Sequence, residues 1–472
     1  MSAEEMRTLG YRVVDQVVDH LTRISEHRVG SKGDPEALRG TLAETLPEHP
    51  TPIEEIFRRL DRDVWPNMLN ILHPRFFAFV PGPSNFVSVA ADFLSAGYNV
   101  FNGSWLGGSG AAALELTVID WLRSLCGLPA EAGGLFVSGG SVANLTGLLA
   151  ARRAILADET AKAVVYYSDQ AHSSIGRAVR AIGVPDDRIR CVPSDARFRL
   201  PLGPLADQVA RDRAAGLRPF CVIANAGTTS TGAVDPLRSI AELCHTQGLW
   251  MHIDGAYGAA AVISERGRRA LDGLDLADSI SLDPHKWLFQ SVECGCVLVR
   301  DRQLLKAAFS TTAAYLAELH RDTREINPCD YGIQLTRSFR ALKLWMSIQY
   351  FGFAAFRAAV DRGFSLAELA ERTVRQMPDW EVVTPAEMGI VSFRRRGAPE
   401  TFYHALHTAM LADGYAFLSS TILNGQTALR MCTINPRTTE ADIVDTLRWL
   451  DTLGAGIPVS EGGLKPAPTT TA

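Results

Sequence analysis

The stretch Asp278-Ser-Ile-Ser-Leu-Asp-Pro-His-Lys-Trp287 joins a buried strand to a reactive side chain. Its apolar first half predicts the end of a strand, which Pro284 interrupts because proline cannot continue a ladder of hydrogen bonds. His285 and Lys286 therefore stand where the strand ends, followed by bulky apolar residues. An amine that loses hydration among apolar neighbours is a usable nucleophile towards a carbonyl. The pattern favours a reactive Lys286, although a lysine taken alone is more often a solvated surface residue.

Residues 134–299 contain seven runs typical of strands, several of them separated by helical patterns. The runs are mostly continuous and apolar, as expected for strands that are covered on both faces. They predict an α/β fold with a mainly parallel seven-stranded sheet flanked by helices, whose ligands bind at the carboxyl ends of the strands. The last run is expected to form an edge strand. The expected strands are Gly134–Val137, Ala163–Tyr167, Ile189–Val192, Phe220–Asn225, Leu249–Ile253, Ser279–Leu282 and Gly295–Val299.

The N-terminal part is expected to be helical. Apolar residues at three- and four-residue steps predict an amphipathic helix over residues 3–26, with Ser2 and Glu5 as a capping box. Its apolar stripe must be covered by the body of the chain or by a second subunit. A linker is expected over residues 28–40, and a second helix, capped by its first threonine, over residues 51–69.

The C-terminal part is expected to form a smaller lobe. Residues 306–330 are polar and aperiodic and predict a mobile loop. A helix over residues 342–356 precedes alternating helices and strands, which predict an α+β domain. The expected division is an N-terminal helical segment (1–72), a large α/β domain (73–340), a small α+β domain (341–460) and a disordered tail (461–472).

Composition excludes several classes of protein. With 472 residues, 47% hydrophobic and 21% charged, the chain is typical of a soluble globular protein of more than one lobe. The net charge of -5 offers no basic footprint for nucleic acid. We see no signal peptide and no run able to span a membrane, so a cytoplasmic protein is expected. The eight cysteines lack the spacing of a metal site, so no metal is expected.

Further strand ends carry groups suited to a ligand. The turn with Gly140 and Ser141 follows a strand and opens a helix, where backbone N–H groups can bind an anion. His172 and Thr229 also follow strands, where an imidazole can stack on a flat ring and a hydroxyl can bond to its edge. Each feature alone is equally typical of an ordinary turn. The turn matches no Walker or dinucleotide fingerprint, which disfavours a nucleotide-binding Rossmann enzyme.

Asp254 ends another run of buried apolar residues. A buried carboxylate without a partner is costly, so Asp254 is expected to face a cation. A pyridinium nitrogen at about 4 Å would contribute up to roughly 4 kcal/mol at an effective dielectric constant near 20. Together the strand ends offer an anion cradle, an imidazole, hydroxyls, a carboxylate and an amine. This set fits pyridoxal 5′-phosphate (PLP), which has a phosphate, a pyridine ring and an aldehyde.

Three motifs resemble the group II PLP-dependent amino-acid decarboxylases of fold type I, most closely the aromatic-L-amino-acid decarboxylases. They are Thr228-Thr, His-Ile-Asp254-Gly-Ala-Tyr and Asp-Pro-His-Lys286-Trp. The likeness extends from His73-Pro-Arg-Phe-Phe to the segment Arg337-Ser-Phe-Arg-Ala-Leu-Lys-Leu-Trp345. It implies the PLP-dependent transferase fold, decarboxylation of an L-amino acid to an amine, and a homodimer with active sites at the interface.

The resemblance also implies roles for single residues. Lys286 would form the aldimine with PLP, Asp254 would pair with the ring nitrogen and His172 would stack on the ring. Tyr315 would return a proton to the substrate carbon after carbon dioxide leaves. The phosphate and ring edge would be surrounded by Gly140, Ser141, Thr229 and His285. The substrate would contact Phe79, Pro81, Gly82, Trp105 and His172.

Some positions depart from the aromatic decarboxylases and leave the substrate open. Gly82, Val142 and Asp283 stand where that group has or favours Thr, Glu and Asn. The aromatic stretch 76–79 favours an aromatic side chain, and glutamate, diaminobutyrate or a branched aliphatic amino acid remain alternatives. An oxygen-dependent aldehyde synthase is another, against which Tyr315 argues because such enzymes typically carry Phe there. A non-catalytic scaffold is disfavoured by the retention of the reactive lysine.

Overall fold

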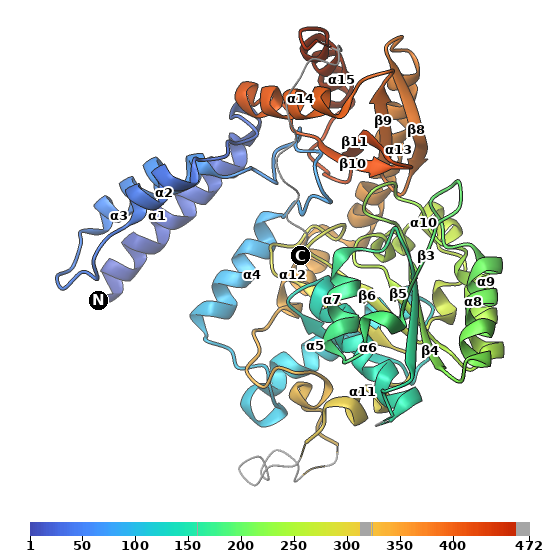
Figure 1. Cartoon of the computed structure of the whole chain (residues 1–472). Coiled ribbons are helices and arrows are strands. Elements are labelled where there is room, and N and C mark those ends of the chain that lie inside the picture. The colour runs from blue at the N-terminus through green and yellow to red at the C-terminus, as the bar shows by residue number, and fades with distance from the viewer. Residues whose placement is uncertain (158, 312–321, 323, 459–472) are drawn as a thin grey trace.

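A seven-stranded sheet forms the centre of the protein, whose computed structural model describes residues 1–157, 159–311, 322 and 324–458 (Figure 1). In spatial order its strands are β1 (Gly133–Val137), β7 (Gly295–Val299), β6 (Ser279–Leu282), β5 (Trp250–Asp254), β4 (Arg218–Asn225), β2 (Ala163–Ser168) and β3 (Ile189–Val192). All neighbouring pairs from β6 to β3 are parallel, and β7 alone runs antiparallel to its neighbours. The predicted mainly parallel sheet is confirmed.

Strand β7 lies inside the sheet, and the prediction that it forms an edge was wrong. It pairs with β1 on one side and with β6 on the other, and all of its residues are buried. A continuously apolar strand suits such a position because both of its faces and both of its edges are covered. The prediction followed chain order, which does not fix spatial order. The edge strands are β1 and β3.

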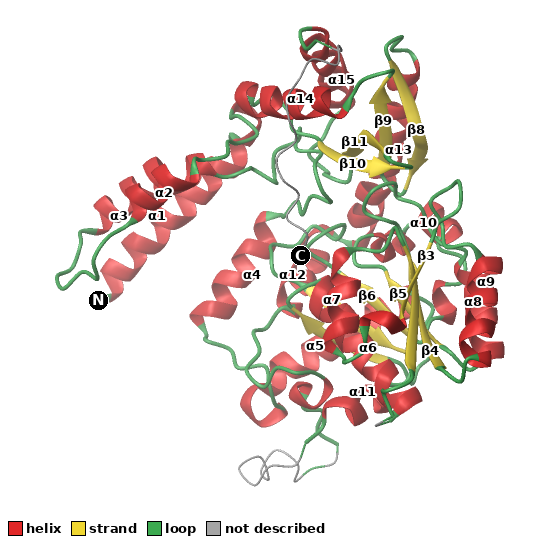
Figure 2. Ribbon diagram, in the orientation of Figure 1, coloured by secondary structure: helices red, strands yellow, loops and turns green. Residues whose placement is uncertain are grey.

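Helices cover both faces of the sheet (Figure 2). Adjacent strand residues point into different cores, since Val164 and Val222 belong to one buried cluster and Val165 and Ile223 to the other. This alternation places apolar side chains against helices on each side, as the sequence predicted. One core includes residues of α5 (Trp105–Leu125), α8 (Leu202–Ala214) and α9 (Leu237–Gln247), and the other includes residues of α6 (Gly140–Leu156), α7 (Ser173–Ala181) and α11 (Arg302–Phe309).

The N-terminal helices project from the body of the protein (Figure 1). They are α1 (Ala3–Thr22), α2 (Pro35–Leu42) and α3 (Ile53–Arg59). The predicted capping box of Ser2 and Glu5 is present at the start of α1, which buries none of its residues. The expected linker at 28–40 was wrong in its second half, because Asp34 caps α2 and proline occupies its first position.

The second predicted helix is shorter than expected. Helix α3 ends at Arg59, and residues 60–67 continue as a π turn and a 3₁₀ turn. Thr51 is not its cap, because the residue at that position is Pro52, which has no side chain able to accept a hydrogen bond. Helix α4 (Phe86–Gly97) was not predicted, although Asn85 caps it through a bond from Ser88 N.

A second sheet, which is antiparallel, packs with C-terminal helices. Together they form a smaller α+β unit, as predicted. Its strand order is β10 (Ser419–Leu423), β11 (Gln426–Cys432), β9 (Ile390–Arg395) and β8 (Trp380–Glu387). Its helices are α13 (Phe353–Arg375), α14 (Glu400–Asp413) and α15 (Glu440–Ala455), whereas α12 (Ala341–Phe351) packs against α4 and α5 of the larger unit. The helix expected over 342–356 is broken at Gly352, whose φ of 78° glycine adopts readily.

The expected loop, tail and domain boundaries compare with the structure as follows. The stretch 306–330, expected as a loop, begins inside α11 and ends with a 3₁₀ turn at Pro328–Tyr331. Most of its centre, and the tail at 461–472, lie outside the described residues. The domain boundaries stay predictions. Within the described ranges, no helix combines the length and apolar character needed to cross a membrane.

Candidate active site

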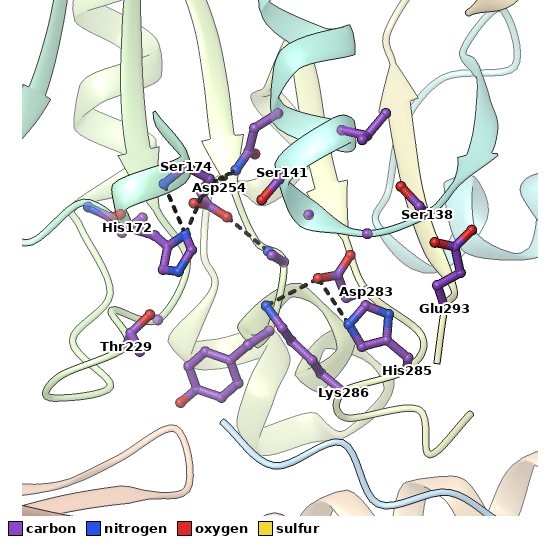
Figure 3. Close-up of a pocket in the computed structure, with 18 of the residues that line it drawn as sticks. Ser138, Ser141, His172, Ser174, Thr229, Asp254, Asp283, His285, Lys286 and Glu293 are labelled. Carbon is purple, nitrogen blue, oxygen red and sulfur yellow. Dashed lines mark hydrogen bonds and ion pairs between the residues drawn. The ribbon is translucent and has the colours of Figure 1, made fainter. Parts of the chain in front are cut away.

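A cavity of about 370 Å³ lies at the carboxyl ends of the strands of the large sheet (Figure 3). The segments that follow β1, β2, β4, β5 and β6 all contribute to its lining. Such strand ends are where open α/β sheets bind ligands. Its lining includes Gly140, Ser141, His172, Thr229, Asp254, His285 and Lys286, which the sequence singled out, as well as Asn144, Ser174, Asn225, Tyr257, Asp283 and Glu293.

The turn before α6 provides a glycine cradle. A Cβ atom on Gly140 would lie 2.8 Å from the Cβ of Ala256 and 2.9 Å from Oδ2 of Asp283, so only glycine fits there. Ser141 follows in the first turn of a 17-residue helix. The first N–H groups of a helix lack intrahelical acceptors and, with the helix dipole, favour an anion. The cradle therefore suits a phosphate group.

Asp254 is the last residue of β5 and is 7% exposed. Its Oδ1 accepts hydrogen bonds from Ser281 Oγ and from the backbone N of Ala256, both at 3.2 Å. Its Oδ2 accepts one from Asn144 Nδ2, also at 3.2 Å. The carboxylate is thus held by donors on both of its oxygens, and it borders the cavity, where it can bind a protonated ring nitrogen.

His172 stands at the start of α7 with its ring partly open to solvent. Its Nδ1 accepts a hydrogen bond from Ser174 N at 3.2 Å and lies 2.9 Å from Ser174 Oγ. Burial of the inner side of the ring lowers its pKa, an effect that nearby Lys286 and Arg177 strengthen and Asp254 opposes. His172 is therefore a neutral imidazole, as a ring that stacks on a flat cofactor requires.

Lys286 lies in a more polar setting than its sequence suggested. Its Nζ is 3.1 Å from Oδ2 of Asp283, which is 1% exposed and lies 3.6 Å from Nε2 of His285. The expectation of apolar surroundings for the amine was wrong, because the carboxylate three residues earlier folds back onto it. Apolar packing follows instead at Trp287, which is fully buried and stacks on Tyr257 at 5.6 Å. That packing anchors the backbone next to the amine.

Burial also affects His285. Its Nδ1 lies 2.7 Å from the backbone O of Cys294, and the loss of hydration lowers its pKa. The ring is therefore neutral, and its Nδ1 lies within hydrogen-bonding distance of both the backbone O (2.7 Å) and the backbone N (3.2 Å) of Cys294.

Of the residues expected to hold the substrate, His172 lines the cavity, whereas Phe79, Pro81, Gly82 and Trp105 lie outside its lining. Gly82 approaches closely, since a Cβ atom there would lie 2.7 Å from His285 O, and the neighbouring Pro81 is buried. Phe79 is 55% exposed. Trp105 begins α5, and its backbone N–H donates to Asn327 Oδ1 at 2.9 Å. Tyr315 lies outside the described residues.

Arg430 is a site neighbour that the sequence did not reveal. It is buried on β11 of the small sheet, and its Nη1 donates to Thr229 O at 2.6 Å and to Phe79 O at 3.1 Å. The bond to Thr229 joins residues 201 positions apart in the chain, so no local motif could have indicated it. Arg430 thus links the small sheet to the rim of the cavity.

The arrangement fits PLP on the chemistry of its groups. The cradle at Gly140 admits a phosphate against a helix N-terminus, Asp254 offers a hydrogen-bonded carboxylate, and Lys286 offers an amine in the same cavity. Its volume lies within the range usual for small-molecule sites.

Comparison with known proteins agrees with this chemistry. The family model described as the pyridoxal-dependent decarboxylase conserved domain matches residues 35–396. An aromatic-L-amino-acid decarboxylase of Bacillus atrophaeus is 44% identical over 98% of both chains. A phenylacetaldehyde synthase of Arabidopsis thaliana is 32% identical over 93% of this chain and 94% of its own. The structure of Oryza sativa TDC with PLP and tryptamine superposes with a TM-score of 0.92, at 29% identity over 96% of this chain and 98% of that one.

Proposed function

Because the chain belongs to the pyridoxal-dependent decarboxylase family, we propose that it converts an aromatic L-amino acid to the corresponding amine and carbon dioxide. Family membership makes it a PLP-dependent carboxy-lyase that acts on an amino acid. The preference for an aromatic side chain is supported by the decarboxylase that is 44% identical over nearly the whole chain. The observation that carries the proposal is one cavity lined by Lys286, Asp254 and the glycine cradle.

When bound, PLP supplies an electron sink for the pair left on the substrate's α-carbon as carbon dioxide departs. Lys286 would provide the amine that bonds to the aldehyde of PLP, once the ammonium group beside Asp283 has lost its proton. Asp254 would hold the proton on the ring nitrogen, and the N–H groups at Gly140 and Ser141 would hold the phosphate. His172 would lie against the ring and restrict the approach of water.

The return of a proton to the α-carbon is assigned to Tyr315 by resemblance alone. The residue at position 315 also bears on whether the product is an amine or an aldehyde. An aldehyde synthase is a second candidate, favoured by the 32% identity to the Arabidopsis thaliana phenylacetaldehyde synthase. A phenol at 315 favours the amine, because the carbon is then protonated before oxygen can react.

A homodimer with active sites at the interface is the assembly we propose. Exposed apolar side chains gather on α1, on α4 and at the residue that ends α4: Met6 (55%), Tyr11 (67%), Phe93 (63%), Leu94 (45%) and Tyr98 (80%). Large exposed apolar patches of this kind usually mark an interface. We further propose a cytoplasmic location, the domain boundaries at 72/73 and 340/341, and substrate contacts from Phe79, Pro81, Gly82 and Trp105.

The decisive experiment traps the lysine. Borohydride reduction of the PLP-loaded protein, followed by peptide mapping, is expected to place the pyridoxyl label on Lys286. Incubation with the twenty amino acids and hydroxylated aromatics then measures carbon dioxide, amine, aldehyde and peroxide. Amine from an aromatic substrate without peroxide supports the proposal, whereas aldehyde with peroxide supports the second candidate. A label elsewhere would overturn the assignment of Lys286.

A further inference from the structure

A chain of buried hydrogen bonds runs behind the cavity, beginning at Trp250. The indole Nε1, which can only donate, bonds to Ser279 Oγ at 2.8 Å. The hydroxyl proton of Ser279 is thereby free for Nδ1 of His252, 2.7 Å away. Burial lowers the pKa of His252 to about 4, so the ring is neutral. With Nδ1 accepting, its proton must be on Nε2.

The chain continues to Asn144, which is 1% exposed. His252 Nε2 donates to Asn144 Oδ1 at 3.0 Å, and Asn144 Nδ2 donates to Asp254 Oδ2 and to Ser174 Oγ, each at 3.2 Å. The opposite orientation of the amide would set its oxygen against a carboxylate oxygen, where neither atom can donate. The carboxylate therefore fixes the direction of donation: Asn144 Oδ1 accepts from Nε2 of the neutral His252, whose Nδ1 is left to accept from Ser279.

The last step reaches the cavity. Ser174 Oγ accepts from Asn144 and keeps its own proton for donation to Nδ1 of His172, at 2.9 Å. The backbone N of Ser174 donates to the same nitrogen at 3.2 Å. The proton of the neutral His172 must then be on Nε2. His172, Ser174 and Asp254 lie together on one side of the cavity, with Lys286 across from them (Figure 3).

We propose that Asn144 is a positioning residue that orients two groups of the site at once. Its amide holds Asp254 towards the ring nitrogen, and through Ser174 it helps to keep the proton of His172 on Nε2. His172 then meets an anionic group, such as the carboxylate of a substrate, as a hydrogen-bond donor and not as a base. The role in the reaction rests on the proposed function, whereas the direction of the chain does not.

The direction is tested on the cofactor-free protein. ¹⁵N NMR of protein labelled at its histidines, with the two signals assigned through His172→Gln and His252→Gln, reports which ring nitrogen carries the proton. Both rings are expected to be neutral with the proton on Nε2 at pH 7.5. A proton on Nδ1 of either ring overturns the proposed direction, and this result is independent of any activity.

The role of Asn144 is tested by the binding of pyridoxine phosphate, which keeps the ring nitrogen and phosphate but cannot bond to Lys286. Asn144→Leu is expected to weaken its binding by roughly tenfold or more, because a hydrogen bond to a charged group is lost. Ser174→Ala, which leaves the bond to Asp254 intact, is expected to change it by less than threefold. Equal losses in both variants, or none in Asn144→Leu, would contradict the proposal.

Asn102 offers a matched control for loss of stability. It is fully buried and donates to Glu115 Oε2 at 2.6 Å, away from the cavity lining. Asn102→Leu is expected to lower the unfolding midpoint as much as Asn144→Leu does while leaving pyridoxine phosphate binding unchanged. If it weakens binding equally, Asn144 is only a structural residue. If the unaltered protein fails to bind, the proposed function fails, and the NMR result still stands.

Discussion

The Oδ2 atom of Asp283 lies 3.1 Å from the Nζ atom of Lys286. The same two residues are joined through the backbone, where Lys286 N donates to Asp283 O at 2.9 Å. The other carboxylate oxygen, Oδ1, is buried without a hydrogen-bond partner among the described residues. This carboxylate therefore acts on one cation, the amine that must become neutral before it can attack an aldehyde.

Asp283→Asn is expected to speed the reaction of Lys286 with pyridoxal. The ion pair between Asp283 and the Lys286 ammonium group contributes on the order of 1–2 kcal/mol. Its loss is expected to raise the rate of the reaction with pyridoxal by about tenfold. The rate is measured by trapping with borohydride at fixed times. The control is Glu293→Gln, which alters another carboxylate of the cavity whose partner is Arg340. A slower reaction in Asp283→Asn would contradict the prediction.

Asp254→Asn is expected to lower kcat by about 10²–10³-fold. A neutral amide lacks the attraction of roughly 4 kcal/mol by which the carboxylate would keep the ring nitrogen protonated. Single-turnover release of carbon dioxide measures the effect. Asp212→Asn removes a buried carboxylate that pairs with Arg190 away from the cavity, and it is expected to cost stability but not kcat. Similar kcat values in the two variants would refute the assignment of Asp254.

Tyr315→Phe is expected to divert the reaction from amine towards aldehyde and hydrogen peroxide. The resemblance carries this expectation, because removal of the phenol slows protonation of the α-carbon and leaves time for oxygen to react. Amine and aldehyde are quantified in air and under nitrogen. A variant that forms only amine in air would show that another group protonates the carbon.

His73 is expected to make the protein less stable in acid. Burial lowers its pKa from 6.5 to about 4, so between these values the unfolded chain binds a proton that the folded chain does not. Stability present above pH 6.5 is therefore lost as the pH falls towards 4, by an amount on the order of 3 kcal/mol. The free energy of unfolding in urea is expected to depend less on pH for His73→Gln than for the unaltered protein. The measurement runs from roughly pH 7.5 to 5, which covers the upper part of the predicted window. His404→Gln, at an exposed histidine, should leave the dependence unchanged.

Phe93→Asp is expected to dissociate the proposed homodimer, since a charge would enter an apolar interface on α4. Light scattering after gel filtration measures the mass, and PLP binding reports on the site. Ile422→Asp changes a residue that is similarly exposed, at 67%, on β10 of the small sheet. If the two variants have equal masses, α4 is not part of the dimer interface.

The sequence predicted features that depend on local order. Strands and helices followed apolar periodicity. Lys286, Asp254, His172 and Gly140 were singled out because each ends or follows a strand, and the strand ends converge. The inner position of β7 escaped prediction because the pairing of strands depends on contacts distant in sequence. The neighbours of the site escaped for the same reason: Arg430 arrives from the small sheet, and Asn144 acts through Ser174 on another helix.

The place of β7 also bears on synthesis. Strand β1 finds its only partner within the large sheet in β7, so its five residues stay unpaired on the ribosome until Val299 has emerged. The glycine turn follows β1 directly, and its geometry depends on that late pairing. A nascent chain that has already made Gly140, Asp254 and Lys286 therefore still lacks the strand that pairs with β1, and this edge of the sheet is completed only once Val299 has followed.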